Sequence, residues 1–139
     1  MANQYSQFTY DDALSLQDST AITSTTTGAT IIDLGAGLVE GYLVLDVSAC
    51  EVASTDEIYL VCLEGSNVAA MTSGSVCLAQ IEMGNATAPA DADTSTGRFA
   101  VPFRNEQNGT IYRYVRLYTE VAGTIDTTGL TFSAFIAKD

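Results

Sequence analysis

A strict alternation of two kinds of side chain between residues 111 and 121 constrains the fold of this chain more than any other feature. Odd positions carry Ile111, Val115, Leu117 and Val121, with Arg113 and Thr119 among them; even positions carry Tyr112, Tyr114, Arg116, Tyr118 and Glu120. A period of two indicates a β-strand whose two faces differ. The odd face suits a hydrophobic core. The even face presents three tyrosines and an arginine, so it is either a contact surface or a half-buried sheet face.

Further segments of the same kind occur along the chain. Short runs rich in apolar residues predict strands at 13–17, 31–34, 42–49, 58–63, 77–83, 98–104 and 129–137. The wholly apolar run at 58–63 indicates a strand inside a sheet, and Pro102 places its own strand at an edge or a bulge. Residues 18–30, 64–75 and 84–97 are expected to be loops, with a helical turn at 68–71.

About eight strands separated by turn residues, without an amphipathic helix, predict an all-β protein. Eight strands with several long connections favour an antiparallel two-sheet jelly-roll sandwich. We expect an extended N-terminal arm at residues 1–12 and a single jelly-roll domain at 13–139. Three aromatic residues, Tyr5, Phe8 and Tyr10, lie on the polar arm, which either packs on its own domain or reaches a neighbouring molecule.

Composition excludes several classes of function. The chain has 17 acidic and 5 basic residues, a formal net charge of −12 and no histidine. Nucleic-acid binding requires clustered Lys and Arg, so neither nucleic acid nor an anionic membrane is an expected partner. The absence of histidine removes the commonest general base and metal ligand. No apolar run reaches the length of a membrane span, and residues 1–5 show no secretory signal, so we expect synthesis in the cytoplasm.

Cysteines and paired carboxylates predict no cofactor, no metal and no catalytic residue. Cys50, Cys62 and Cys77 are too widely spaced for a zinc site and are interpreted as three small buried thiols. Asp91, Asp93 and the Asp11-Asp12 pair are interpreted as solvated loop residues, because a calcium site needs six to eight oxygen ligands.

Two segments carry a family resemblance. Residues 14–34, which end in Ile-Ile-Asp-Leu before Gly35-Ala-Gly37, are one, and residues 113–121, Arg-Tyr-Val-Arg-Leu-Tyr-Thr-Glu-Val, are the other. Together with the last strand, they resemble the small jelly-roll cement (decoration) proteins of tailed-bacteriophage capsids. The resemblance implies a structural virion protein on the outer capsid surface. It would act as a homotrimer that clamps neighbouring major capsid subunits without catalysis.

Candidate contact residues follow from the arm and from the even face. They are Tyr5, Phe8, Tyr10, Tyr112, Tyr114, Arg116 and Tyr118. Tyr and Arg are enriched at protein interfaces, which favours a protein partner. The alternative is a carbohydrate- or receptor-binding jelly-roll module of a phage particle, in which tyrosines stack on sugars; the absence of Trp weakens it.

Overall fold

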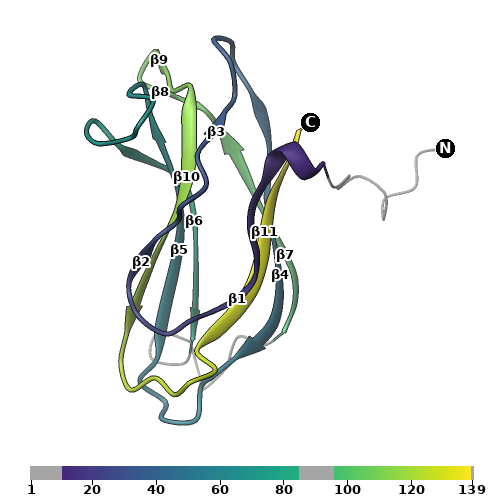
Figure 1. Ribbon diagram of the computed structural model, residues 1–139, viewed down its shortest axis with the longest axis vertical. Helices are drawn as coiled ribbons and strands as arrows, with labels where there is room; N and C mark the ends of the chain where they lie inside the picture. Colours follow the sequence, from purple (N-terminus) through teal and green to yellow (C-terminus); the bar gives the residue numbers. More distant parts are fainter. Residues whose placement is uncertain (1–10, 85–95, 139) are drawn as a thin grey trace, which may run out of the picture.

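The computed structural model describes residues 11–84 and 96–138, and these form two antiparallel β-sheets packed face to face (Figure 1). Sheet A has the order β1-β11-β4-β7, with β1 at Ser15–Ile22, β11 at Leu130–Lys138, β4 at Glu40–Cys50 and β7 at Gly97–Arg104. Sheet B has the order β2-β10-β5-β6, with β2 at Thr26–Thr27, β10 at Tyr114–Ala122, β5 at Ile58–Ser66 and β6 at Val76–Gly84. The predicted all-β antiparallel sandwich is therefore confirmed.

Four short elements complete the described structure. β3 (Ile32–Asp33) pairs with the first residues of β10. β8 (Glu106–Gln107) and β9 (Thr110–Ile111) form a small hairpin, and the 3-10 helix η2 (Asp12–Leu14) precedes β1. Asp11 caps this helix, because its Oδ1 accepts a hydrogen bond from the Ala13 amide.

The core fills the space between the sheets. Alternate side chains of every long strand point inward, as the period of two requires. On β11 these are the residues predicted to share a face, Leu130, Phe132, Ala134 and Ile136, and all four are buried. Leu43, Leu45 and Val47 of β4 lie beside them in the same sheet, and Val115 and Leu117 of β10 cover them from sheet B.

Two positional predictions are confirmed. β5 lies inside sheet B between β10 and β6, as its apolar run indicates. β7, which contains Pro102, is the edge strand of sheet A and pairs with β4 alone. An edge strand tolerates proline because one side of its backbone needs no partner.

Several strand boundaries differ from the sequence prediction by a few residues, and two of the differences change which segments are strand. The first strand begins at Ser15 and continues to Ile22, so part of the expected loop at 18–30 is strand. The run at 111–121 is not one strand either: β10 begins at Tyr114. The break arises from the tight β8–β9 hairpin, whose central residues Asn108 and Gly109 both have positive φ angles, 52° and 85°. Asn-Gly is the pair that favours such a turn.

Removing a core side chain should cost more stability than removing an outward one from the same strand. We expect Leu117→Ala to lower the free energy of unfolding by about 2–5 kcal/mol, because it leaves a cavity between the sheets. Glu120→Ala, at an exposed position of β10, is the control and should change it by less than about 0.5 kcal/mol. Urea denaturation measures both; equal losses would contradict the assignment of the two faces.

Candidate functional site

The outer face of sheet B carries a row of large polar side chains from β10. Tyr114, Arg116 and Tyr118 alternate with the buried Val115 and Leu117, so all three point away from the core. We call these three residues the tyrosine row. Each is partly exposed, so the row is a half-buried surface that a partner could still cover.

Arg116 is held in place by the neighbouring strand. Register places it opposite Glu64 of β5, and its Nε lies 3.2 Å from Glu64 Oε1. Both side chains are only 20% exposed, the lowest exposure of the ion pairs between described residues. The pair therefore fixes the guanidinium in the middle of the tyrosine row.

Tyr112 does not belong to this row, which corrects the sequence prediction. It precedes β10 and its backbone bonds to Asn105 instead of to a sheet neighbour. A Cβ atom on Gly65 would lie 3.1 Å from Tyr112 Cβ and 2.6 Å from Leu78, a residue packed against the core. Tyr112 thus covers the end of the sandwich, because the break before β10 interrupts the alternation.

Arg113 and Asp33 form a second ion pair beside the row. Arg113 Nε and Nη2 donate to the two carboxylate oxygens of Asp33 at 2.7 and 2.9 Å. The guanidinium also lies over the Tyr114 ring, 5.5 Å from its centroid. Hydrogen bonds from Arg113 and from the Gly35 amide lower the pKa of Asp33 from 3.8 to about 2. The pair joins β3 to the start of β10.

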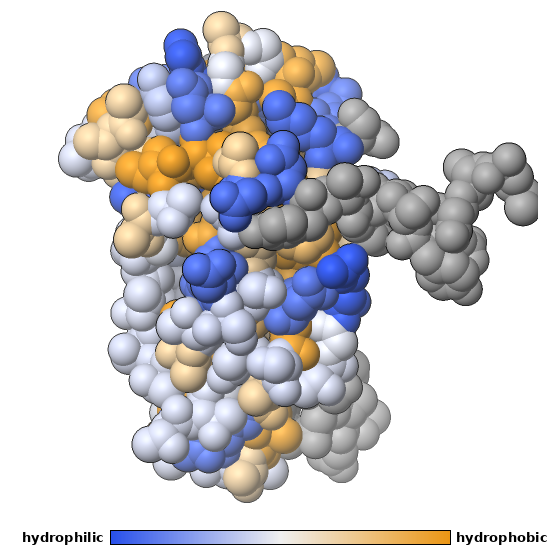
Figure 2. Space-filling view, turned by 45° about the vertical axis from the view of Figure 1, so that its right-hand side comes forward, coloured by the Kyte–Doolittle hydropathy of each residue, from blue (hydrophilic) through white to orange (hydrophobic). Residues whose placement is uncertain are grey.

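Exposed hydrophobic side chains gather at one end of the sandwich. Among described residues the large exposed ones are Ile31, Leu38, Val68 and Ile111. Leu38, Val68 and Ile111 belong to three loops or hairpins that meet at the upper end in Figure 1, and Figure 2 shows hydrophobic surface gathered toward that end. We call these three residues the apolar end. Ile31 immediately precedes β3 and is not counted among them.

Asn105 ties the loops of the apolar end together. It is fully buried, and its Oδ1 accepts from the Val39 amide at 2.8 Å. Its Nδ2 donates to the carbonyls of Gly37 and Tyr112 at 3.2 and 3.0 Å. Asn67 makes a similar link, from its amide group to the backbone of Ile111 and Arg113. Polar side chains thus hold the apolar side chains in fixed positions.

The charges are distributed unevenly between the two ends. At the opposite end, the β4–β5 and β10–β11 loops carry Glu51, Asp56 and Asp126, and none of the five basic residues of the chain. Asp56 is bound by the Thr124 amide and hydroxyl, at 3.0 and 2.9 Å, which lowers its pKa. Arg104 and Arg113 lie at or beside the apolar end.

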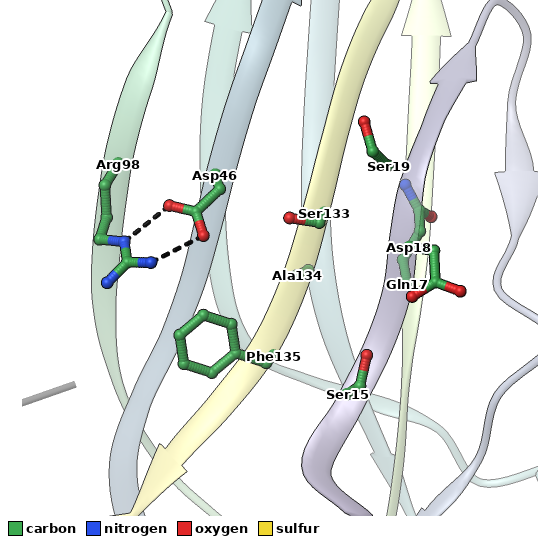
Figure 3. Close-up of a pocket in the computed structure, with 9 residues that line it drawn as sticks. All are labelled: Ser15, Gln17, Asp18, Ser19, Asp46, Arg98, Ser133, Ala134 and Phe135. Atoms are coloured by element: carbon green, nitrogen blue, oxygen red, sulfur yellow. Dashed lines mark hydrogen bonds and ion pairs between the residues drawn. The ribbon is translucent and has the colours of Figure 1, made fainter. Parts of the chain in front are cut away.

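A groove of about 450 Å³ crosses the outer face of sheet A. Its lining is shown in Figure 3: Ser15, Gln17, Asp18 and Ser19 from β1, Asp46 from β4, Arg98 from β7 and Ser133, Ala134 and Phe135 from β11. Arg98 donates to both oxygens of Asp46, at 2.6 and 2.8 Å, and lies 5.5 Å from the Phe135 ring centroid. The groove is polar, but Arg98 within it already interacts with Asp46 and with the Phe135 ring.

The predicted N-terminal arm, the acidic loop and the three cysteines have different outcomes in the structure. The arm with Tyr5, Phe8 and Tyr10, and the loop with Asp91 and Asp93, lie outside the described residues. The prediction of three buried thiols is confirmed for Cys62 alone: Cys50 is only partly buried, and Cys77 is exposed because a β-bulge places it on the outer face of sheet B.

Chemical groups elsewhere serve the fold. Glu57 is buried, and its Oε2 accepts from the Ser54 amide at 2.8 Å in the turn before β5. Residues 11–84 and 96–138 contain no group of three or more Cys, Asp or Glu side chains arranged to hold a metal ion. In the same ranges no helix is long and apolar enough to span a membrane.

Sequence reasoning missed the apolar end and Asn105. The four exposed hydrophobic residues lie far apart in the sequence, within segments interpreted as loops or strand ends. The Asn108-Gly109 pair is the one local pattern near these residues, and it predicts a tight turn but not the burial of Asn105 or the apolar end. Comparison with protein-family models finds no match, and comparison with curated protein sequences finds none either.

The Asp33–Arg113 pair predicts a specific dependence of stability on pH. A carboxylate whose pKa is lowered on folding stabilises the folded state above its unfolded pKa and loses this effect as pH falls through the folded pKa. The contribution of Asp33 should therefore be full above about pH 4 and disappear near pH 2. We expect Asp33→Asn to lower the Tm at pH 6 and to match the original protein near pH 2.

Thermal unfolding from pH 2 to pH 7 measures this difference. Asp18→Asn removes an exposed carboxylate from β1 and controls for the change in net charge. A constant gap between Asp33→Asn and the original protein across the range would show that the ion pair adds no stability.

Proposed function

We propose that this protein is a structural component of a tailed-bacteriophage virion that binds the outer capsid surface as a homotrimer and cements neighbouring major capsid subunits. The observation that carries the proposal is the concentration of exposed hydrophobic side chains at the apolar end. A fixed apolar surface rimmed by charges is the usual form of a protein-contact site. The resemblance of residues 14–34 and 113–121 to decoration proteins supplies the identity of the partner.

The strand order supports the jelly-roll part of the proposal. β1, β4, β7 and β11 lie in sheet A, and β2, β5, β6 and β10 lie in sheet B. Most connections therefore cross from one sheet to the other, and the β5–β6 hairpin stays within its sheet. Two sheets with four main strands each, connected in this way, are expected of a double Greek key; the short β3 adds to sheet B beside β10.

Position along the molecule suggests a role for each surface. The apolar end is transverse to the strands, so it can meet the shell while the sandwich stands upright. The tyrosine row runs along the side of sheet B, where a neighbouring protomer of a trimer would lie. The opposite end, with Glu51, Asp56 and Asp126, would then face solvent.

Cementing requires binding at the contact surface and no catalysed reaction. A protein that binds the assembled lattice but not its dissociated subunits stabilises the lattice by mass action. Many trimers, each touching several subunits, add a multivalent effect without new contacts.

The groove of sheet A favours a second candidate, a carbohydrate- or receptor-binding module. Serine hydroxyls beside an aromatic ring can recognise a sugar. Arg98 already occupies a position over the Phe135 ring, which weakens sugar stacking there. Binding of glycans that Ser133→Tyr abolishes, with capsid binding absent, would favour this candidate.

Capsid binding should depend on the apolar end. A carboxylate introduced by Leu38→Asp or Val68→Asp would have to be desolvated at the contact, so we expect affinity to fall at least tenfold. Thr127→Asp, an exposed position at the opposite end, is the matched control and should bind normally. Co-sedimentation with capsids assembled without this protein measures the effect. Equal heat resistance of capsids with and without the bound protein would contradict the cementing role.

Trimer formation should depend on the tyrosine row. We expect the double change Tyr114→Ala and Arg116→Ala to raise the trimer dissociation constant more than tenfold, since central Tyr and Arg residues dominate interface energies. Analytical ultracentrifugation measures the trimer fraction, with Ser133→Ala on the outer face of sheet A as the control. If the double variant instead loses its folded circular dichroism signal, the row is structural and has no separate contact role.

A further inference from the structure

Two cysteine sulfur atoms meet on the outer face of sheet B. Cys62 lies on β5 and Cys77 on β6, and both are thiols whose Sγ atoms are 2.6 Å apart. The sulfur atoms of a disulfide are about 2.05 Å apart, so only about 0.55 Å separates this contact from a bond. The pairing of β5 with β6 holds the two thiols in contact.

A β-bulge produces this contact. β5 pairs with β6 as Leu63↔Ala79 and then as Glu64↔Cys77, so Leu78 is an extra residue on β6. The extra residue shifts Cys77 onto the outer face, beside Cys62. Bulges of this kind redirect single side chains and are typical of positions with a specific use.

We propose that Cys62 and Cys77 form a reversible disulfide that cross-links β5 and β6 when the protein meets a peroxide or a small-molecule disulfide. With a peroxide, the Cys77 thiolate attacks one oxygen, gives sulfenic acid and releases hydroxide. The Cys62 thiol then displaces water from this sulfenic acid and forms the S–S bond. In total two thiols and one hydrogen peroxide give one disulfide and two waters, a two-electron oxidation of sulfur. With oxidised glutathione, the Cys77 thiolate attacks one sulfur and releases one glutathione thiolate. The Cys62 thiol then attacks the Cys77 sulfur of the mixed disulfide and releases the second glutathione, so one disulfide is reduced to two thiols as the protein disulfide forms.

The environments of the two thiols assign these roles. Cys77 is exposed and can meet the oxidant, whereas Cys62 is 8% exposed and reacts with what is next to it. Burial, and then the hydrogen bond to Cys77, raise the pKa of the Cys62 thiol. Cys62 is therefore a poor nucleophile toward the oxidant. In the second step its contact with Cys77 offsets this low reactivity, because the two reacting sulfur atoms are already held together.

A disulfide between Cys62 and Cys77 would cross-link the β5–β6 hairpin, whose loop runs from residue 67 to residue 75. The cross-link joins two residues that are 15 positions apart in the sequence. By restricting the unfolded chain, closure of such a loop should raise the Tm by about 5–10 °C. Where the proposed function holds, the pair would be reduced in the host cytoplasm and oxidised in the released particle.

The test uses the isolated protein and oxidised glutathione, so it is independent of any capsid. Thiols titrated in denaturant should fall from three to one, the intact mass should drop by about 2 Da, and dithiothreitol should reverse both. Peptide mapping of the oxidised original protein should show Cys62 joined to Cys77. The Tm should rise on oxidation.

Variants separate the pair from the third cysteine. Cys50→Ser should keep the rise in Tm, and its thiol count should fall from two to none. Cys62→Ser and Cys77→Ser should both lose the rise. A count that stays at three, a link that includes Cys50, or a cross-link between two chains on a non-reducing gel would overturn the proposal.

Discussion

The structure depends on one constraint: each sheet must bury one face against the other. A strand exposes alternate residues to opposite sides, so burial of Val115 and Leu117 on β10 forces Tyr114, Arg116 and Tyr118 outward. The same rule on β11 buries Phe132 and leaves Ser133 and Phe135 on the outer side of sheet A. The tyrosine row and the groove of sheet A are therefore by-products of the core, placed by the alternation and not by local preference.

Outward residues then interact with each other in ways that the sheet register decides. Register puts Arg116 opposite Glu64 and Arg98 opposite Asp46, and both pairs form ion pairs. A one-residue change of register, the bulge at Leu78, brings Cys77 to Cys62. Exposed ion pairs contribute little stability each, so their main effect is to fix side chains on surfaces that a partner can meet.

The ends of the sandwich differ because their loops are held differently. At the apolar end the buried Asn105 satisfies backbone groups of two other segments, and Asn67 bonds to Ile111 of β9 and to Arg113 just before β10. A fully bonded buried polar group rigidifies its surroundings, since breaking any of its bonds leaves an unpaired group. Leu38, Val68 and Ile111 are thereby held exposed on a rigid support, which suits a contact surface better than a mobile loop does.

Local periodicity in the sequence predicts the all-β class, the two faces of β4 and β11 and the interior position of β5. The missing amide hydrogen of Pro102 predicts the edge position of β7. The sequence also identified Tyr114, Arg116 and Tyr118 as one outward row. The tertiary structure alone decided that Tyr112 leaves the row, that Cys77 meets Cys62, and that Leu38, Val68 and Ile111 share an end. These depend on a break, a bulge and contacts between distant loops, and such non-local pairings leave no periodic trace in the chain.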